Sequence, residues 1–296
     1  MKMENIKNKS RISEQHPCFS EKAHRQFARL HLPVAPECNI QCNYCIRKFD
    51  CVNETRPGVT SAVLRPHEAI ERVRAVMERN RGVSVVGIAG PGDPLANDAT
   101  FETFRLVHEE FPEAILCIST NGLMLPERLG DLRACGVESI TITINALTSE
   151  TAEKIYSSVF QKGRRLTGRA AACALLYNQW SGLSKALAAG LVVKVNTILT
   201  PGINDDEVPM IALNAASAGA EIMNVMPLIP QAAFKHLSRP SCAMLDAARK
   251  KCGAYMPQMT HCKQCRADAF GRLGEDGDAE LELLHSRLGE DYCENV

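Results

Sequence analysis

The sequence predicts an α/β fold, an open barrel of about six β/α units with an extension at each end. From about His31 to about Gly253, short apolar runs alternate with segments whose apolar residues recur at helical spacing. The connections between these segments are short, which favours a parallel sheet with helices outside it. Six units are too few for an eight-stranded closed barrel. The chemistry of such a fold is expected at the carboxyl ends of its strands.

The predicted elements follow one another in a regular order. Buried strands are expected over residues 30–35, 83–90, 114–120, 139–146, 191–199 and 221–229. Helices are expected over residues 67–80, 100–111, 126–136, 181–190 and 205–219. Two of these helices, 126–136 and 181–190, end at a glycine placed as a C-cap. The stretch that leads up to Trp180 is less regular.

Three parts are predicted along the chain. Residues 1–30 are polar and charged, with an amphipathic turn or two, and form an N-terminal extension. Residues 31–252 form the partial barrel. After about residue 253 the periodicity lapses around a paired-cysteine loop, so residues 253–296 are expected to fold over the barrel as a C-terminal extension.

The composition argues against several classes of protein. Lysine plus arginine equals aspartate plus glutamate at 34 each, so no basic excess favours nucleic acid or a membrane surface. The N-terminus lacks the apolar core of a signal peptide, and no apolar run reaches the length of a membrane span. We expect a cytoplasmic protein. Its 13 cysteines then point to metal binding or catalysis rather than to disulfides.

Three cysteines, Cys38, Cys42 and Cys45, stand close together just after the first predicted strand. Thiolates at this spacing can hold one [4Fe–4S] cluster from a single loop, which leaves its fourth iron open for a small molecule. The alternative is a structural zinc site with Cys51 as the fourth ligand.

The loop CNIQCNYC resembles the signature of the radical S-adenosylmethionine (SAM) superfamily. This resemblance implies that the open iron binds SAM and that the reduced cluster cleaves it to a 5′-deoxyadenosyl radical. The loop AGPGDP after the second strand and the turn STNG after the third resemble the parts of that family that contact SAM. The SAM-binding residues that the resemblance implies are Tyr44, Gly90, Gly92, Asp93, Ser119, Asn121, Asn145 and Asn196.

Seven blocks between about His16 and about Gly271, among them HPCFSEKAH and HCKQCRADA, resemble the nitrogenase cofactor biosynthesis family NifB. That resemblance implies two auxiliary [4Fe–4S] clusters, making three clusters in all. It implies that SAM serves as methyl donor and as radical source, and that the two auxiliary clusters fuse around a carbide into the [8Fe–9S–C] precursor of the iron–molybdenum cofactor. Many members carry a further C-terminal cluster-carrier domain. Because this chain ends at Val296, it is expected to resemble the short form.

The same resemblance implies six ligands for the auxiliary clusters. The first cluster is expected on His24, Cys51 and Cys117, and the second on Cys18, Cys262 and Cys265. His16 and His31 are the alternatives for the histidine. A neutral imidazole suits a cluster that is later released, because it binds iron less firmly than thiolate and can leave by protonation. The remaining cysteines are expected to pack or to lie in the tail: Cys135, Cys173, Cys242, Cys252 and Cys293.

The implied partners are SAM, a scaffold that donates iron–sulfur clusters, a carrier that accepts the product and an electron donor such as a ferredoxin. Two other functions remain open. One is a different radical SAM enzyme with auxiliary clusters, such as a peptide maturase or a molybdopterin-type cyclase. The other is a non-catalytic iron–sulfur scaffold or carrier.

Overall fold

The computed structural model describes residues 2–53, 55, 60 and 62–277. Its main sheet has eight strands in the order β11-β10-β1-β3-β4-β5-β8-β9. The six strands from β1 to β9 in this order run parallel. They are β1 (Ala28–His31), β3 (Val83–Ile88), β4 (Ile115–Thr120), β5 (Val137–Thr143), β8 (Val192–Leu199) and β9 (Ile222–Pro227). The short strands β10 (Phe270–Arg272) and β11 (Glu275–Gly277) extend the β1 edge in antiparallel fashion. The predicted open barrel of six parallel strands is confirmed.

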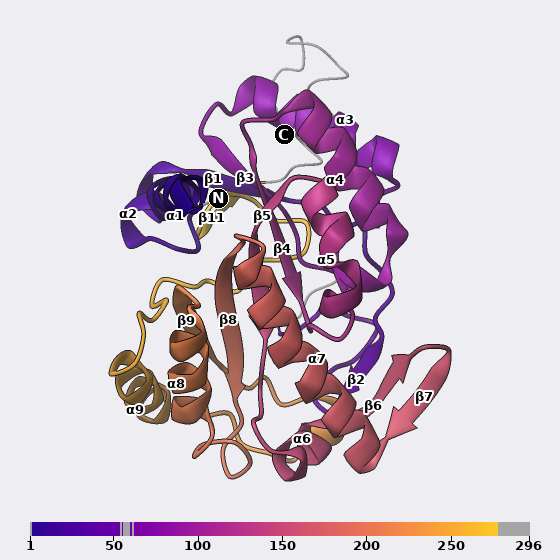
Figure 1. Cartoon of the computed structure of the whole chain (residues 1–296), viewed down its shortest axis with the longest axis vertical. Helices are drawn as coiled ribbons and strands as arrows, with labels where there is room; N and C mark the ends of the chain where they lie inside the picture. Colours follow the sequence, from indigo (N-terminus) through magenta and orange to yellow (C-terminus); the bar gives the residue numbers. More distant parts are fainter. Residues whose placement is uncertain (1, 54, 56–59, 61, 278–296) are drawn as a thin grey trace, which may run out of the picture.

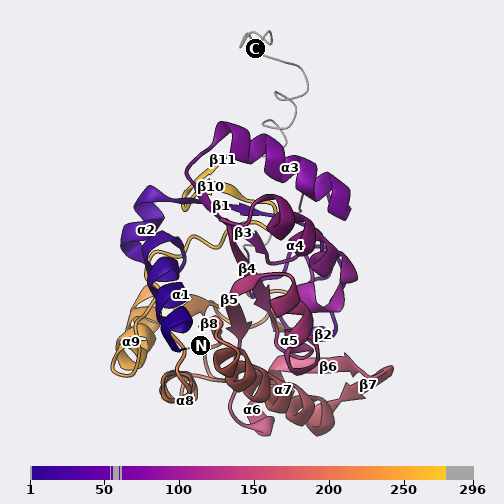
Figure 2. The same ribbon diagram turned by 45° about the horizontal axis from the view of Figure 1, so that its top comes forward.

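Helices cover the outer face of the parallel sheet, as Figures 1 and 2 show. They are α3 (Pro66–Arg79), α4 (Asp98–Glu110), α5 (Leu125–Ala134), α7 (Gly168–Ala188) and α8 (Val208–Ala218), with α9 (Cys242–Gly253) packed beside α8. Alternate residues of each strand face them and form the main core: Leu30, Val86, Leu116, Ile140, Val193 and Val225. The residues between these positions face the inner side of the curled sheet, because side chains alternate along a strand. The inner side carries the polar groups of the candidate site.

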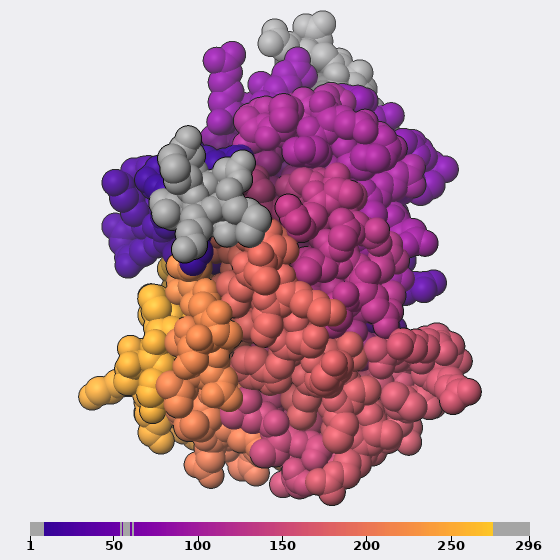
Figure 3. Space-filling model, viewed as in Figure 1, coloured from indigo at the N-terminus to yellow at the C-terminus, as the bar shows by residue number. Residues whose placement is uncertain are grey.

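The N-terminal and C-terminal segments of the described residues lie on the open side of the sheet. The N-terminal segment forms α1 (Lys2–Gln15) and α2 (Glu21–Gln26), and Ile12 of α1 packs against the inner sheet residues Val85 and Val192. The C-terminal strand β10 pairs with β1, with Arg29 opposite Gly271. In the space-filling view the indigo N-terminal and the orange-to-yellow C-terminal segments lie on the same side of the molecule (Figure 3). Chain segments from opposite ends therefore close one side of the barrel.

A second, three-stranded sheet supports the cysteine loop. It has the order β2-β6-β7, with β2 (Ile40–Cys42), β6 (Tyr156–Gln161) and β7 (Arg164–Thr167), and all its pairs are antiparallel. The helix α6 (Ser149–Ile155) precedes β6, and two short 3₁₀ turns, η1 (Pro94–Ala96) and η2 (Ala232–Phe234), complete the elements. The prediction of an irregular stretch before Trp180 is therefore wrong, because α6, β6, β7 and the first half of α7 occupy it.

Two further predictions differ from the structure. The first strand ends at His31 rather than at residue 35, because Pro33 and Pro36 have no N–H to donate to a ladder. The N-terminal extension holds two helices rather than a turn or two. The glycine after α5 is confirmed as a cap position, since Gly136 has φ +80° and a Cβ there would lie 2.4 Å from the His108 ring. Within the described residues, no helix is long and apolar enough to cross a membrane.

Candidate active site

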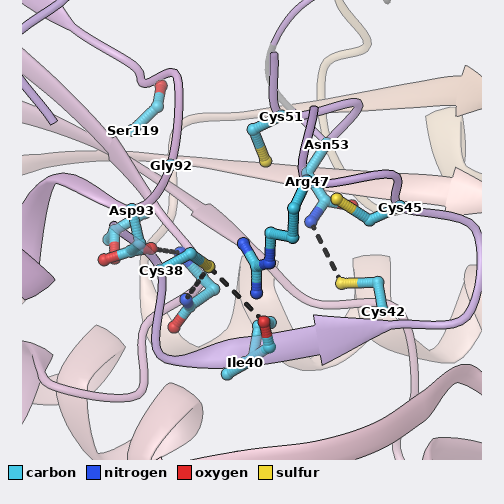
Figure 4. Close-up of a pocket in the computed structure, with 12 residues that line it drawn as sticks. Cys38, Ile40, Cys42, Cys45, Arg47, Cys51, Asn53, Gly92, Asp93 and Ser119 are labelled. Atoms are coloured by element: carbon cyan, nitrogen blue, oxygen red, sulfur yellow. Dashed lines mark hydrogen bonds between the residues drawn. The ribbon is translucent and has the colours of Figure 1, made fainter. Parts of the chain in front are cut away.

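One cavity lies at the carboxyl ends of β3 and β4 and contains the three cysteines of the CNIQCNYC loop (Figure 4). Cys42 and Cys45 are almost fully buried, and Cys38 is partly exposed. Loops after neighbouring strands supply the opposite wall, because the carboxyl ends of parallel strands meet at one edge. The lining residues are Cys38, Ile40, Cys42, Cys45, Arg47, Cys51, Asn53, Gly92, Asp93, Ser119, Thr120 and Asn121. We call this the first cavity.

The cysteine loop is held by backbone and by buried side chains. Cys42 lies opposite Tyr156 of β6, and the Cys45 amide donates to the Cys42 carbonyl at 3.1 Å, which makes a tight turn between the two thiols. Tyr44 is buried beside the cavity, where its hydroxyl donates to Asn53 Oδ1 and accepts from Asn145 Nδ2. Tyr44 and Asn145 thus hold the loop through buried hydrogen bonds, and neither residue lines the first cavity.

The glycine loop after β3 packs backbone to backbone on the segment before Cys38. The Gly92 amide donates to the Ala35 carbonyl at 2.6 Å, and the Asp93 amide donates to the Glu37 carbonyl at 2.7 Å. A Cβ at Gly92 would lie 2.1 Å from the Glu37 oxygen, far inside any real contact. Gly90 contributes its carbonyl, which accepts from the Ala35 amide. The close approach requires glycine at position 92, and it fixes where Cys38 leaves the loop.

Asp93 connects this glycine loop to the end of β4. Its buried carboxylate accepts from the Thr120 hydroxyl at 2.9 Å, from the Asn121 amide at 2.6 Å and from the Leu95 amide at 3.0 Å. Burial raises the pKa of Asp93 to about 6, against the opposing effect of these hydrogen bonds. Asn121 in turn extends its side-chain amide toward the Cys38 sulfur at 3.8 Å and to Asn39 Oδ1 at 2.7 Å. The acidic residue thus positions the wall that faces Cys38.

The thiols of the first cavity share their space with a cation. Burial raises the pKa of Cys38, Cys42 and Cys45, and the charge of Arg47 acts in the opposite direction on Cys38 and Cys45. Figure 4 shows the Arg47 guanidinium extending toward the Cys38 sulfur. Buried thiols of raised pKa stay protonated at neutral pH until a metal displaces the proton. Three such thiols in one cavity fit the donor set of an iron–sulfur cluster with an open iron.

A second cavity lies on the inner side of the sheet. Its walls come from β1, β3, β4, β5, β8 and β9, and segments around Cys18 and Cys262 close it. Four cysteines from distant parts of the chain line it: Cys18, Cys117, Cys262 and Cys265. Its other lining residues are His16, Arg29, His31, Val85, Ala89, Ser119, Thr141, Lys194, Asn196, Asn224, Met259, Lys263 and Leu273.

Several buried polar atoms of residues that line the second cavity have no hydrogen-bond partner among the described residues. His16 Nε2, Thr141 Oγ1 and Asn224 Oδ1 are buried and have no hydrogen-bond partner within the described part of the chain. Buried polar atoms are normally satisfied, so such atoms around a cavity indicate a site for a polar occupant. His31 lies beside Cys117 because the strand between them carries Gly87, where a Cβ would come within 3.1 Å of the imidazole.

The two cavities have one residue in common. Ser119, the penultimate residue of β4, lines both. The next residue, Thr120, lines the first cavity and bonds to Asp93. Cys117, two positions earlier on the same strand, lines the second cavity. The end of β4 is therefore the wall that separates the two cavities.

The structure places the five predicted cysteine ligands of the auxiliary clusters in the walls of the two cavities. Cys18, Cys262 and Cys265 share the second cavity with Cys117, whereas Cys51 lines the first cavity. His24 lines neither, and its ring stacks on that of His261 with 4.8 Å between centroids. His16 and His31 are the histidines in the wall of the second cavity.

The predicted SAM-binding residues are also found in different places. Gly92, Asp93, Ser119 and Asn121 line the first cavity, and Asn196 lines the second. Four lining cations, Arg29, Arg47, Lys194 and Lys263, were missed, because an isolated basic residue in a sequence gives no sign that it lines a cavity. Within the described residues, no three histidine, cysteine or acidic side chains are grouped as a site for one metal ion.

Comparison with known proteins gives two kinds of relative. Residues 32–214 match the family model of the radical SAM superfamily. The FeMo cofactor biosynthesis protein NifB of Klebsiella pneumoniae is 49% identical over 276 residues, which are 91% of this chain and 59% of that protein. The protein of the same name from Methanocaldococcus infernus is 42% identical over 275 residues, 92% of this chain and 90% of that protein. The chain thus spans about three-fifths of the bacterial relative and most of the archaeal one.

Solved structures with low sequence identity share the fold. SuiB of Streptococcus suis superposes with a TM-score of 0.60 at 12% identity and covers 88% of this chain and 54% of its own. A radical SAM methyltransferase from Sphaerobacter thermophilus superposes with a TM-score of 0.51 at 18% identity. The match covers 78% of this chain and 64% of the methyltransferase. The chain matches the superfamily model, carries a cysteine loop at the strand ends and is 42–49% identical to the two NifB proteins over about nine-tenths of its length. It therefore belongs to the radical SAM superfamily of enzymes and, within it, to the NifB family.

Proposed function

We propose that this chain is the enzyme that makes the carbide-centred [8Fe–9S–C] precursor of the nitrogenase iron–molybdenum cofactor by fusing two [4Fe–4S] clusters. The observation that carries the proposal is the pair of cysteine-containing cavities that share Ser119. One cavity suits a source of radicals, and the other suits an iron–sulfur substrate. The NifB relatives are named for FeMo cofactor biosynthesis, which supports the same assignment.

In the first cavity, Cys38, Cys42 and Cys45 would hold the cluster that binds SAM. Bound there, the cluster would supply the electron for reductive cleavage of SAM. Asp93 and Asn121 orient the wall across from Cys38, and burial of the loop excludes water from the cavity. Arg47 places a positive charge beside the thiols, where it favours their deprotonated, ligating form.

In the second cavity, the four thiols would bind the two substrate clusters. Cys18, Cys262 and Cys265 lie together and form one candidate set. Cys117 belongs to the other set, with Cys51 from the first cavity and one histidine. Because His24 is stacked on His261 outside the lining, we propose that this histidine is His31 or His16. His31 Nδ1 lies 3.1 Å from the Arg266 carbonyl, an outer contact of the kind that orients ligating histidines.

The two cavities divide the chemistry between them. SAM would serve first as methyl donor to a cluster sulfide and then as the radical source that abstracts hydrogen from the new carbon. The proposed partners are a scaffold that delivers clusters, an electron donor such as a ferredoxin and a carrier that takes the product. Ser119 lies between the place of radical formation and the substrate.

The test is anaerobic reconstitution with iron, sulfide, dithionite and SAM, followed by product and iron analysis. The proposal predicts both 5′-deoxyadenosine and S-adenosylhomocysteine, with about twelve irons per chain from three cubanes. Deoxyadenosine without the homocysteine product would favour another radical SAM enzyme with auxiliary clusters. Neither product would favour a non-catalytic scaffold, and about four irons would exclude auxiliary clusters.

One substitution tests the second cavity by itself. Cys262→Ala should remove the electron paramagnetic resonance (EPR) signal of one auxiliary cluster and leave SAM cleavage in place, because Cys262 lines only the second cavity. Cys173→Ala is the matched control, since Cys173 is exposed on α7. A spectrum of Cys262→Ala identical to that of the control would dismiss Cys262 as a ligand.

A further inference from the structure

The second cavity is strongly cationic. Three of its lining residues are bases, Arg29, Lys194 and Lys263, and none of its described lining residues is aspartate or glutamate. Arg29 is 1% exposed and Lys194 is 6% exposed, whereas Lys263 lies at the surface. Cysteine thiolates that bind iron carry negative charge, and a nearby positive charge stabilises it. Two buried bases in the same cavity as four cysteines thus favour an anionic occupant.

Lys194 lies in the middle of this cavity wall. It is in β8, where it pairs with Thr141 of β5, and Thr141 lines the same cavity. Its side chain faces inward with that of Asn196, two residues along the strand, while Val193 and Val195 face the main core. A lysine in the centre of a parallel strand is unusual, because such strands are normally apolar on both faces.

The charge of Lys194 reaches groups from both ends of the chain. Burial lowers the pKa of His16, and the nearby Lys194 lowers it further. Burial raises the pKa of Cys18, and both Lys194 and Arg29 oppose that rise. Lys194 therefore lies close enough to the thiols of this cavity to stabilise negative charge on them.

Arg29 reaches the same thiols from the opposite wall. Its Nη2 donates to the Cys265 sulfur at 3.1 Å, and its Nη1 donates to the carbonyl of Gly271 in β10. Arg29 therefore has a second role, which is to join β1 to the C-terminal strand. Lys194 is the better residue for a test, because removing Arg29 would also remove backbone contacts.

We propose that Lys194, assisted by Arg29, is the counter-charge of an anionic iron–sulfur cluster in the second cavity, and that it sets how tightly the cluster is retained and at what potential it is reduced. The inference rests on the proposed function, because that function places substrate clusters in this cavity. Thiolate ligands make such clusters net negative, and charge near a cluster shifts its potential. Lys194 is a positioning residue here, since it acts on the occupant through charge and supplies no ligand.

The experiment compares anaerobically reconstituted wild type with Lys194→Met, Lys194→Gln, Lys194→Arg and a matched control. The control is Lys185→Met, because Lys185 is exposed on the outer helix α7. Three quantities are measured: the EPR signal of the SAM cluster with and without SAM, the rate at which a ferrous chelator removes auxiliary iron, and the midpoint potential of the auxiliary signal. The chelator and the redox titration are independent of catalytic turnover.

The two neutral variants should keep the SAM-cluster signal and lose auxiliary iron on the order of tenfold faster, because one nearby positive charge is gone. Their auxiliary potential should become more negative, since the oxidised cluster carries less negative charge. Lys194→Arg should behave as wild type. Neutral variants that match Lys185→Met in both readouts would overturn the inference, as would loss of the SAM cluster together with the auxiliary ones, which indicates a structural role. A wild type that holds only about four irons would instead overturn the proposed function.

Discussion

Replacing Gly92 by alanine tests whether the backbone contact between two loops positions the cysteine cluster. The added methyl would lie 2.1 Å from the Glu37 carbonyl oxygen, 2.5 Å from its carbon and 2.7 Å from the Pro36 oxygen. All three are backbone atoms, so no side chain can rotate to relieve the overlap. The two loops must separate by at least about 1.3 Å to lengthen the 2.1 Å contact to an ordinary one of 3.4 Å. Glu37 precedes Cys38, so the first cysteine would move with its loop.

The cost follows from the hydrogen bonds that the separation breaks. The Gly92 and Asp93 amides donate to the Ala35 and Glu37 carbonyls at 2.6 and 2.7 Å. A net contribution of about 0.5–1.5 kcal/mol for each bond gives a loss of about 1–3 kcal/mol in unfolding free energy. For a chain of this size that corresponds to a melting temperature lower by roughly 5 °C.

The assay is thermal unfolding of the metal-free protein, together with iron content and SAM-cluster EPR after reconstitution. Gly130→Ala is the matched control, since Gly130 lies within α5 with no atom within 4 Å of its would-be Cβ. That change should stabilise the protein by about 0.5–1 kcal/mol, as alanine does in a helix. Gly92→Ala should lower both the melting temperature and the occupancy of the SAM cluster. An unchanged melting temperature and cluster content would refute the reasoning.

Two further predictions concern single side chains. Burial raises the pKa of Asp93 to about 6, above the unfolded value of about 3.9. The folded protein therefore binds a proton that the unfolded chain has released. Its stability should fall by about 2–3 kcal/mol as pH rises from about 4 to about 6. Asp93→Asn should flatten that part of the profile in urea unfolding, and a parallel profile would contradict the assignment. His31→Ala should lower auxiliary iron content, whereas His24→Ala should remove only the ring stack on His261; the reverse result would return the ligand role to His24.

The barrel could be predicted from the sequence because its strands and outer helices have distinct periods. The hairpin β6–β7 and the first half of the helix α7 could not, whereas the second half of α7 falls in the predicted helix over residues 181–190. The hairpin pairs with β2 more than a hundred residues earlier, and such pairing leaves no local pattern. The first half of α7 is rich in alanine and small residues on all sides, so it lacks the apolar stripe on which a prediction depends.

In the candidate site, too, some residues could be grouped from the local sequence and others only from the pairing of distant segments. Cys38, Cys42 and Cys45 stand within eight residues, so their grouping in one cavity could be read from spacing alone. The neighbours of Cys117 depend on the register of β1, β3 and β4, which places His31 and Gly87 in one row. Cys18 and Cys265 meet because β1 pairs with β10, a contact between opposite ends of the chain. Ligand sets built across strands therefore need the register as well as the residues.

Both cavities combine buried thiols with a basic residue. Arg47 faces the thiols of the first cavity, and Arg29 and Lys194 face those of the second. Burial alone would keep the thiols protonated, as the raised pKa of Cys38 and of Cys265 shows, the latter to about 11. A fixed cation offsets part of that cost, so that iron can displace the proton without the cavity opening to water. Under the proposed function, the bases would thus favour thiolate ligands inside a largely buried site.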